Sequence, residues 1–377
     1  MNVTIVGAGV AGCAIAWELA SRGATVRVVD PRGVGKGATY ASAGILAPRI
    51  EGRMPELLRL TLCSLGLFDS FIERLRRDGA RSIEYERNGT LQVALDEADA
   101  AALQAAARQL ADAHIPHSWL DARHARRVEP LLSPGVLGAL LIPEHGYVGV
   151  TALVEALADA ARTRGVEFVT GLVSEIRGGE PPQIVTGDGV IKSDVVVIAA
   201  GSWSSQLTGA VSAGAEPSAP ATHASVRPSP VRPIRGQLLD LKMSVRAASR
   251  VLWGTDCYVV PWRDGTVLVG ATVEDVGFDE TATVAGVQQL SGAAIRMLPA
   301  LEQAEFSGVR VGLRPATADE LPVIGISLSM PGIVYATGHY RNGVLLAPLT
   351  ALLVADLVLE NRARTELALT RPDRLGL

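Results

Sequence analysis

The first 30 residues alternate between short apolar runs and one stretch of helical periodicity. An apolar strand over 3–7 leads into a glycine-rich turn, a helix is predicted from Val10 to Arg22 with Gly23 as its stop, and a second strand follows over 25–30. Two strands joined through a helix form a βαβ unit, whose strands are parallel. The pattern therefore predicts an α/β fold.

Helix and strand patterns continue along the rest of the chain. Helices are predicted over 55–78, 97–114, 151–164 and an apolar stretch at 343–359, and strands over 90–95, 166–170, 195–199 and 306–314. The runs on either side of Asp264-Gly265 predict a β-hairpin, in which a two-residue turn would place Tyr258 opposite Ala271. Residues 195–199 (VVVIA) are typical of a parallel strand that is covered on both faces.

Length and changes of pattern predict two domains, because 377 residues exceed what one core usually holds. The first domain, with the parallel sheet, is expected to comprise residues 1–85, 145–225 and 306–377. Residues 86–144 and 226–305 are expected to form a second, inserted domain with an antiparallel sheet. Residues 209–233, rich in Ala, Ser and Pro, are predicted to be a flexible loop.

Composition and charge narrow the classes of partner. Hydrophobic residues make up 48% of the chain and charged residues 20%, which fits a compact protein and excludes global disorder. The net charge of −4 supplies no cationic field, so nucleic acid is not expected as a partner. The longest apolar run is interrupted by Pro348 and Asp356 and is shorter than the ~20 residues of a membrane span.

Cysteine usage and the N-terminal pattern favour a cytoplasmic location. Cys13, Cys63 and Cys257 are widely spaced and form no CxxC motif, so they predict neither a disulfide framework nor a thiolate metal site. The N-terminal residues run straight into a strand pattern and do not resemble a signal peptide. The six histidines show no ligand spacing, and no metal site is expected.

The glycine-rich turn has the spacing of a dinucleotide-binding motif. Gly7, Gly9 and Gly12 match GxGxxG between a strand and a helix, and Asp30 ends the second strand. The first two glycines allow close approach to a pyrophosphate, and the third allows helix and strand to pack closely. Asp30 can accept hydrogen bonds from a ribose. The motif alone leaves FAD and NAD open.

Four later segments resemble the FAD enzymes of the D-amino-acid oxidase family. They are GATYASAGILAP at 37–48, DVVVIAAGSW at 194–203, and the pair GLRPATADELPVIG at 312–325 and GHYRNGVLLAP at 338–348. The last pair resembles specifically the glycine oxidases of the ThiO type. The resemblance implies a Rossmann-like FAD-binding domain with an inserted substrate domain, and FAD held non-covalently.

The resemblance also implies which residues contact FAD. They comprise the glycine-rich turn and second strand end, the small-residue segment, one strand residue, the turn after residue 199 and the loop before the C-terminal helix: Gly7, Gly9, Val10, Ala11, Gly12, Asp30, Pro31, Ala38, Thr39, Ala43, Gly44, Ile45, Val173, Ala200, Gly201, His339, Tyr340, Arg341, Asn342, Gly343, Val344 and Leu345. Asp30 stands where many relatives carry Glu, and Val273 stands where a Met is expected. Both departures bear on substrate range or ribose reach, and neither changes the cofactor.

Arg314, Tyr258 and Arg341 are the candidate substrate residues. A permanently charged, forked guanidinium suits a carboxylate, and Arg314, followed by proline, resembles the family residue with this role. Arg310 lies on the same strand face and is expected to make an internal salt bridge instead. Tyr258 is implied to be a second carboxylate donor, and Arg341 to border the substrate.

The implied reaction is oxidation of the amine of glycine, or of other small amines and amino acids, to an imine. Water would give the keto acid and ammonia, and dioxygen would be reduced to hydrogen peroxide, with the imine supplying synthesis of the thiamine thiazole. Oxidation of sarcosine or D-amino acids, or electron transfer to another carrier, remains an alternative. Relatives imply a homotetramer.

Overall fold

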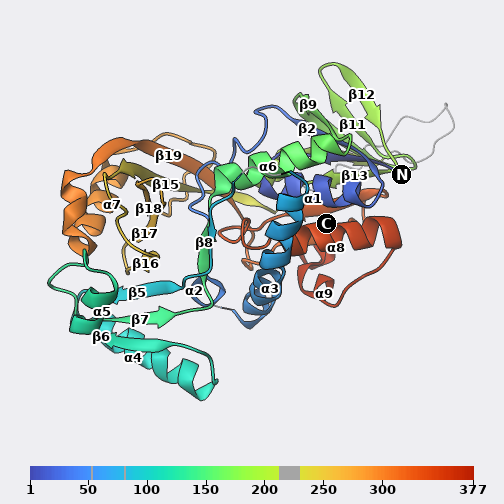
Figure 1. Cartoon of the computed structure of the whole chain (residues 1–377). Coiled ribbons are helices and arrows are strands. Elements are labelled where there is room, and N and C mark those ends of the chain that lie inside the picture. Colours follow the sequence, from blue (N-terminus) through green and yellow to red (C-terminus); the bar gives the residue numbers. More distant parts are fainter. Residues whose placement is uncertain (52–53, 80–81, 212–229) are drawn as a thin grey trace, which may run out of the picture.

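The computed structural model describes residues 1–51, 54–79, 82–211 and 230–377 (Figure 1). One six-stranded sheet has the order β20-β21-β13-β1-β2-β9. Its strands are β20 (Val323–Ile326), β21 (Ile333–Thr337), β13 (Val195–Ile198), β1 (Asn2–Val6), β2 (Thr25–Asp30) and β9 (Glu167–Thr170). All neighbours are parallel except β20 and β21. The βαβ unit read from the first 30 residues is therefore confirmed, and β1 lies inside the sheet.

Helix α1 (Val10–Ser21) lies between α6 (Val150–Thr163) and α8 (Ala347–Glu360) (Figure 1). Its sequence is apolar on nearly every side, because sheet and helices enclose it, and Trp17 is fully buried. Helix α3 (Pro55–Arg77) packs against α8, with α2 (Pro48–Glu51) before it. The apolar stretch at 343–359 is thus largely a buried helix. None of the helices in the described part of the chain combines the length and apolar character that a membrane crossing requires.

The second large sheet has eight strands in the order β19-β15-β18-β17-β16-β5-β7-β6. They are β19 (Glu305–Ala316), β15 (Arg232–Lys242), β18 (Thr266–Gly270), β17 (Tyr258–Pro261), β16 (Val251–Trp253), β5 (Thr90–Ala94), β7 (Gly138–Ile142) and β6 (Ser118–Asp121). Neighbours are antiparallel except β16 and β5. Helices α4 (Glu97–Asp112), α5 (Ala122–Val128) and α7 (Val284–Met297) pack on this sheet.

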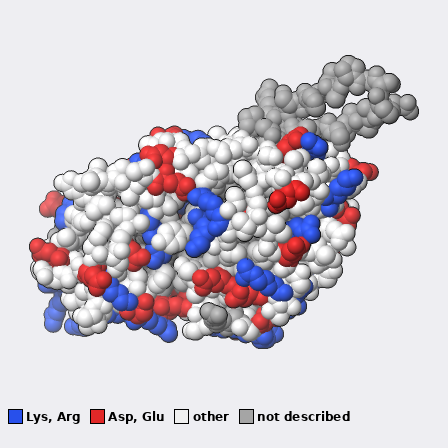
Figure 2. Space-filling model, turned by 90° about the horizontal axis from the view of Figure 1, so that it is seen from above, with Lys and Arg blue, Asp and Glu red and all other residues white. Residues whose placement is uncertain are grey.

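Two small sheets and several short helices complete the fold. β10 (Val173–Gly178) lies between β11 (Gln183–Thr186) and β14 (Thr208–Val211), with β12 (Gly189–Lys192) outside β11, and β8 (Gly146–Val148) lies between β3 (Ile45–Leu46) and β4 (Tyr85–Glu86). The short helices are η1 (Gly201–Ser205), η2 (Pro299–Gln303), α9 (Leu367–Thr370) and η3 (Pro372–Leu375). Acidic and basic side chains are interspersed over the face shown in Figure 2.

Three expectations about the chain need correction. The sheet of the inserted part continues past the expected boundary at residue 306, because β19 pairs with β15 along its length. The predicted loop 209–233 is wrong at its ends, where β14 and β15 form strands, and residues 212–229 of it lie outside the described residues. The hairpin loop is one residue longer than assumed, because Trp262 N–H donates to Thr266 O and Gly265 takes a positive φ of 87°. Tyr258 consequently faces Gly270 and not Ala271.

Candidate active site

The glycine-rich turn is shaped by close backbone contacts that exclude side chains. Gly7 has a φ of +113°, and a Cβ there would lie 2.4 Å from the carbonyl oxygen of Ala199 at the end of β13. A Cβ on Gly12 would lie 2.0 Å from the carbonyl oxygen of Gly7. These glycines therefore allow β1, β13 and α1 to meet at one point, as a dinucleotide cradle requires.

The start of α1 offers hydrogen-bond donors to an anion. Val10 N–H donates to Thr39 Oγ1 at 3.0 Å, and the first bond of the helix ladder runs from Cys13 N–H to Gly9 O. Within the described residues, the N–H groups of Gly9, Ala11 and Gly12 have no acceptor. A helix N-terminus with free N–H groups stabilises phosphate oxygens, so this end of the cavity fits a pyrophosphate.

Asp30 organises the turn at the end of β2. Its Oδ2 accepts from Ala8 N–H at 2.8 Å, and its Oδ1 accepts from the N–H groups of Arg32 and Gly33 at 2.7 and 2.9 Å. The carboxylate also lines the cavity. Asp30 therefore has a role in the local fold besides the ribose contact implied by the resemblance, which stays a prediction.

A cavity of about 690 Å³ runs from this turn to the end of β19. Most of the FAD residues expected from the sequence line it: Gly7, Gly9, Val10, Ala11, Asp30, Pro31, Ala38, Thr39, Ala43, Gly44, Ile45, Val173, Ala200, Gly201, His339, Tyr340, Arg341, Gly343 and Val344. Gly12, Asn342 and Leu345 are not among the lining residues. Gly12 acts instead through the close packing of α1 on the turn.

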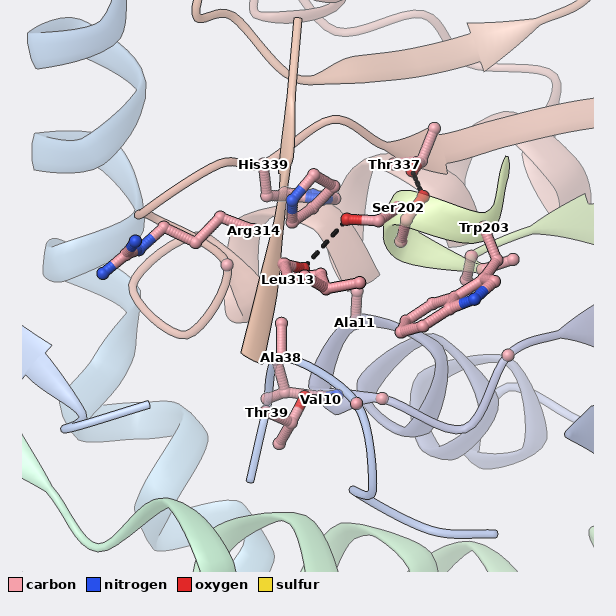
Figure 3. Close-up of a pocket in the computed structure, with 18 of the residues that line it drawn as sticks. Val10, Ala11, Ala38, Thr39, Ser202, Trp203, Leu313, Arg314, Thr337 and His339 are labelled. Carbon is pink, nitrogen blue, oxygen red and sulfur yellow. Dashed lines mark hydrogen bonds between the residues drawn. The ribbon is translucent and has the colours of Figure 1, made fainter. Parts of the chain in front are cut away.

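Two hydrogen bonds fix the loops around the cavity (Figure 3). Ser202 Oγ, in η1, donates to Leu313 O in β19 at 2.9 Å, which ties the turn after β13 to the eight-stranded sheet. Thr337 Oγ1 donates to Gly201 O at 3.1 Å. Figure 3 shows Arg314 and Trp203 at opposite ends of the labelled set. Arg314 and Trp203 therefore mark two separate ends of the cavity.

Arg314 reaches the cavity from β19 and has no carboxylate partner within the described residues. Its Nη1 donates to the carbonyl oxygens of Arg235 and Thr272 at 3.2 and 2.9 Å. Burial lowers its pKa from the usual arginine value, which still leaves an arginine charged at neutral pH. Arg310, by contrast, makes the expected internal salt bridge, with Asp240 at 2.5 Å. Arg314 is thus the guanidinium that is open to an anionic ligand.

Tyr258 lies near Arg314 at the same end of the cavity. Its ring covers Gly270, where a Cβ would come within 2.4 Å of the hydroxyl, and it packs against Trp253 with ring centroids 5.2 Å apart. The hydroxyl has no hydrogen-bond partner within the described residues. Burial raises the pKa of Tyr258 to about 12, against the smaller opposing effect of Arg314. The side chain is therefore a neutral hydrogen-bond donor.

Arg341 is held by an acidic residue that sequence reasoning missed. Glu51, at the end of α2, lies 3.3 Å from Arg341 Nε and also lines the cavity. It falls six residues after Ile45, the last of the small-residue segment expected to contact FAD, so its proximity in sequence was the available signal. Other missed lining residues include Arg32, Trp203 and Glu280, which come from three separate parts of the chain.

The loop before α8 presents backbone donors to the cavity. Leu346 N–H donates to Asn342 O at 2.7 Å, and within the described residues the N–H groups of Gly343, Val344 and Leu345 have no acceptor. His339 is buried, its Nε2 lies 3.0 Å from Thr350 Oγ1, and burial lowers its pKa to about 4. A neutral His339 therefore fixes the loop. Of these donors, those of Gly343 and Val344 belong to residues that line the cavity, and it stays a prediction that they stabilise negative charge on a bound ring.

The glycine-rich turn after β1, where two positions leave no room for a Cβ, and the two sets of free N–H donors fit FAD. The three cysteines, all among the described residues, do not line the cavity. Gly9 and Ala11 would hold the pyrophosphate, and Gly343 and Val344 the flavin edge. Non-covalent binding stays a prediction.

Comparisons with known proteins agree with this geometry. The glycine oxidase of Geobacillus kaustophilus is 33% identical over 97% of this chain and 95% of that protein. Its crystal structure gives a TM-score of 0.86 and covers 96% of this chain and 95% of that chain. The iminodiacetate oxidase structure from Chelativorans sp. BNC1, 28% identical, gives a TM-score of 0.86 and covers 98% of both chains.

A longer relative is also similar. The bifunctional protein ThiO/ThiG of Nostoc sp. is 35% identical over 96% of this chain and 53% of its own length, so the chain spans about half of that relative. The family model described as FAD dependent oxidoreductase matches residues 2–357. The chain therefore belongs to the DAO family of FAD-dependent oxidoreductases.

Proposed function

We propose that this protein oxidises the amine of glycine, or of another small amino acid, to an imine that water converts to the keto acid and ammonia. The observation that carries the proposal is Arg314, a cation in the family's FAD cavity whose hydrogen bonds go only to carbonyl oxygens within the described residues. A small carboxylate is the ligand that complements this guanidinium. Relatives named glycine oxidase support the same substrate class.

The protein groups would bind and orient the substrate. Arg314 would grip the carboxylate, the neutral hydroxyl of Tyr258 would donate a further hydrogen bond to it, and the amine-bearing carbon would then face the ring. Glu51 balances the charge of Arg341, which leaves Arg314 as the anion-binding group. When bound, FAD would supply the two-electron acceptor for the hydride from this carbon, with dioxygen as the final oxidant that is reduced to hydrogen peroxide.

Initial rates of peroxide formation with glycine, sarcosine, D-alanine, L-alanine and iminodiacetate test the proposal. Glycine oxidation predicts the highest kcat/KM with glycine. One methylene changes affinity by only about 1–3 kcal/mol, so measurable rates with sarcosine and D-alanine are expected. No anaerobic bleaching of the flavin by any of the five would contradict the enzyme proposal.

A dehydrogenase that passes electrons to a carrier is the alternative, and bleaching without peroxide on admission of air would favour it. Because relatives named ThiO/ThiG join this region to a second one, we propose that the product supplies thiamine thiazole synthesis. We further propose a cytoplasmic homo-oligomer, and analytical ultracentrifugation tests the expected tetramer.

A further inference from the structure

The connector over residues 271–283, between β18 and α7, crosses from the eight-stranded sheet to the FAD cavity. Near its start, Thr272 O accepts a hydrogen bond from Arg314. Glu274 exchanges two backbone hydrogen bonds with Arg235 of β15, at 2.8 and 3.0 Å. The connector therefore begins at the substrate end of the site and is held there by main-chain contacts.

Side chains of β15 hold the connector at three further points. The buried guanidinium of Arg235 pairs with Glu274 and with Asp279, each at 2.5 Å. Gln237 donates to Glu274 at 2.7 Å, and its Oε1 accepts from Thr283 N–H at 2.8 Å. Because both ends of the connector are fixed to one strand, the movement of its middle residues is restricted, and one of these residues, Glu280, lines the cavity.

The middle of the connector contacts two loops of the cofactor side. The centroids of the Phe278 and Trp203 rings lie 6.0 Å apart. The Arg32 guanidinium lies over the Trp203 ring, 4.0 Å from its centroid. Arg32 Nη1 lies 2.8 and 3.1 Å from the two carboxylate oxygens of Glu280. Arg32, Trp203 and Glu280 all line the cavity.

This cluster lies at the dinucleotide end. Arg32 follows Asp30 by two residues. Trp203 lies in η1, shortly after the end of β13, where the Ala199 carbonyl approaches Gly7. Figure 3 places the Trp203 side chain far from Arg314. The connector thus accepts a hydrogen bond from Arg314 through Thr272 O at one end and contributes Glu280 to the cavity lining at the other.

We propose that the Arg32–Trp203–Phe278–Glu280 cluster is a clasp that retains FAD. Glu280 pins the Arg32 guanidinium against the indole, and Phe278 covers the indole from the connector side. Together they close the cavity wall beside the pyrophosphate. On this proposal, FAD leaves past this wall more easily once the Arg32–Glu280 pair separates. The clasp controls the lifetime of the holoenzyme and takes no part in the oxidation.

The test compares FAD release from wild type, Glu280→Gln and Phe278→Leu. Holoenzyme is diluted into buffer without FAD, and release is followed as the rise of flavin fluorescence. The Kd is measured by titrating apoprotein with FAD. Loss of a half-exposed ion pair with a cation–π contact predicts about three- to tenfold faster release for Glu280→Gln. Added salt should speed release from wild type and should change the variant less.

Asp275→Asn is the matched control, because Asp275 lies on the same connector and pairs with Arg232 in an exposed contact away from the cluster. This control should release FAD at the wild-type rate. Equal release rates for wild type and Glu280→Gln, or slower release from the variant, would overturn the clasp. Thermal melting of the apoproteins identifies any variant that fails to fold. If Phe278→Leu does not fold, the release rate of Glu280→Gln, which keeps the size and shape of the side chain, decides the test alone.

A double-mutant cycle with Arg32→Gln shows whether the pair acts as a unit. If Glu280 acts by pinning Arg32, the two single variants and the double variant should release FAD at similar rates. Multiplying effects would instead mean that each residue acts independently, and would overturn the pinning step. No amino-acid substrate enters these measurements, so they stand or fall separately from glycine oxidation.

Discussion

The guanidinium of Arg314 lies directly over Gly236, so that a Cβ at position 236 would come within 2.4 Å of its terminal nitrogens. Gly236→Ala should therefore push the guanidinium out of line with the substrate. We expect KM for glycine to rise at least about tenfold, the effect of losing about 1.4 kcal/mol from a charged hydrogen bond, with FAD still bound. Gly292→Ala in α7, where a Cβ meets no atom within 4 Å, is the control and should leave KM unchanged.

Arg314→Ala should abolish carboxylate capture and leave the protein yellow. Steady-state KM for glycine and the FAD absorbance of the purified variant check the two halves of this statement. Arg310→Ala should behave in the opposite way, because Arg310 is paired with Asp240 inside the sheet. It should lower the melting temperature and leave KM near the wild-type value. Loss of the yellow colour in Arg314→Ala would show that Arg314 serves the cofactor.

Tyr258→Phe should remove one hydrogen bond from the carboxylate. The expected cost is about 0.5–1.5 kcal/mol, which raises KM by about two- to tenfold. Because the pKa of Tyr258 is raised to about 12, its hydroxyl stays protonated below about pH 11. Any loss of kcat/KM with rising pH in this range comes from another group, so it should persist unchanged in Tyr258→Phe. Disappearance of this loss in the variant would mean that Tyr258 ionises at lower pH.

Gly7→Ala should yield colourless protein, because its Cβ would collide with the Ala199 carbonyl at 2.4 Å and the φ of +113° is strained for alanine. Absorbance at the flavin band, measured after purification with excess FAD, reports the result. Gly66→Ala, in an open position of α3, should retain full colour and gain about 0.5–1 kcal/mol in stability. A yellow Gly7→Ala protein would show that the turn can rearrange.

His145 should make the fold sensitive to acid. It is fully buried with both ring nitrogens unpartnered within the described residues, and burial, with Arg49 and Arg87 nearby, lowers its pKa from 6.5 to about 3. Between these values the unfolded chain binds a proton that the folded chain excludes, so stability falls as the pH drops through this window.

His145→Leu removes this proton uptake. The free energy of unfolding of the variant relative to wild type should rise by about 2 kcal/mol between pH 8 and pH 5, measured by urea denaturation. A difference that stays constant with pH would show that folded His145 can accept the proton.

Local periodicity predicted α1, α3, α4, α6 and α8 and several strands of both sheets, because apolar faces repeat along these elements. It predicted neither the helices α5 and α7 nor the strands β6, β7, β15, β16 and β20. The expected helix over 151–164 and the observed α6 differ by one residue at each end. The hairpin register failed by one residue because nothing in Asp264-Gly265 reveals that Trp262 and Thr266 close a longer loop. Arg32, Trp203 and Glu280 were missed because only the path of the connector brings them together.

The central position of β1 has a consequence for biosynthesis. Its partner β13 ends at Ile198, the next strand β21 ends at Thr337, and in the other sheet β15 pairs with β19, which ends at Ala316. Neither sheet can be completed until most of the polypeptide has left the ribosome. The nascent chain therefore carries its first helix without its neighbour α8 through much of translation, and the loop over residues 339–344 that completes the FAD cavity emerges only near the end of synthesis.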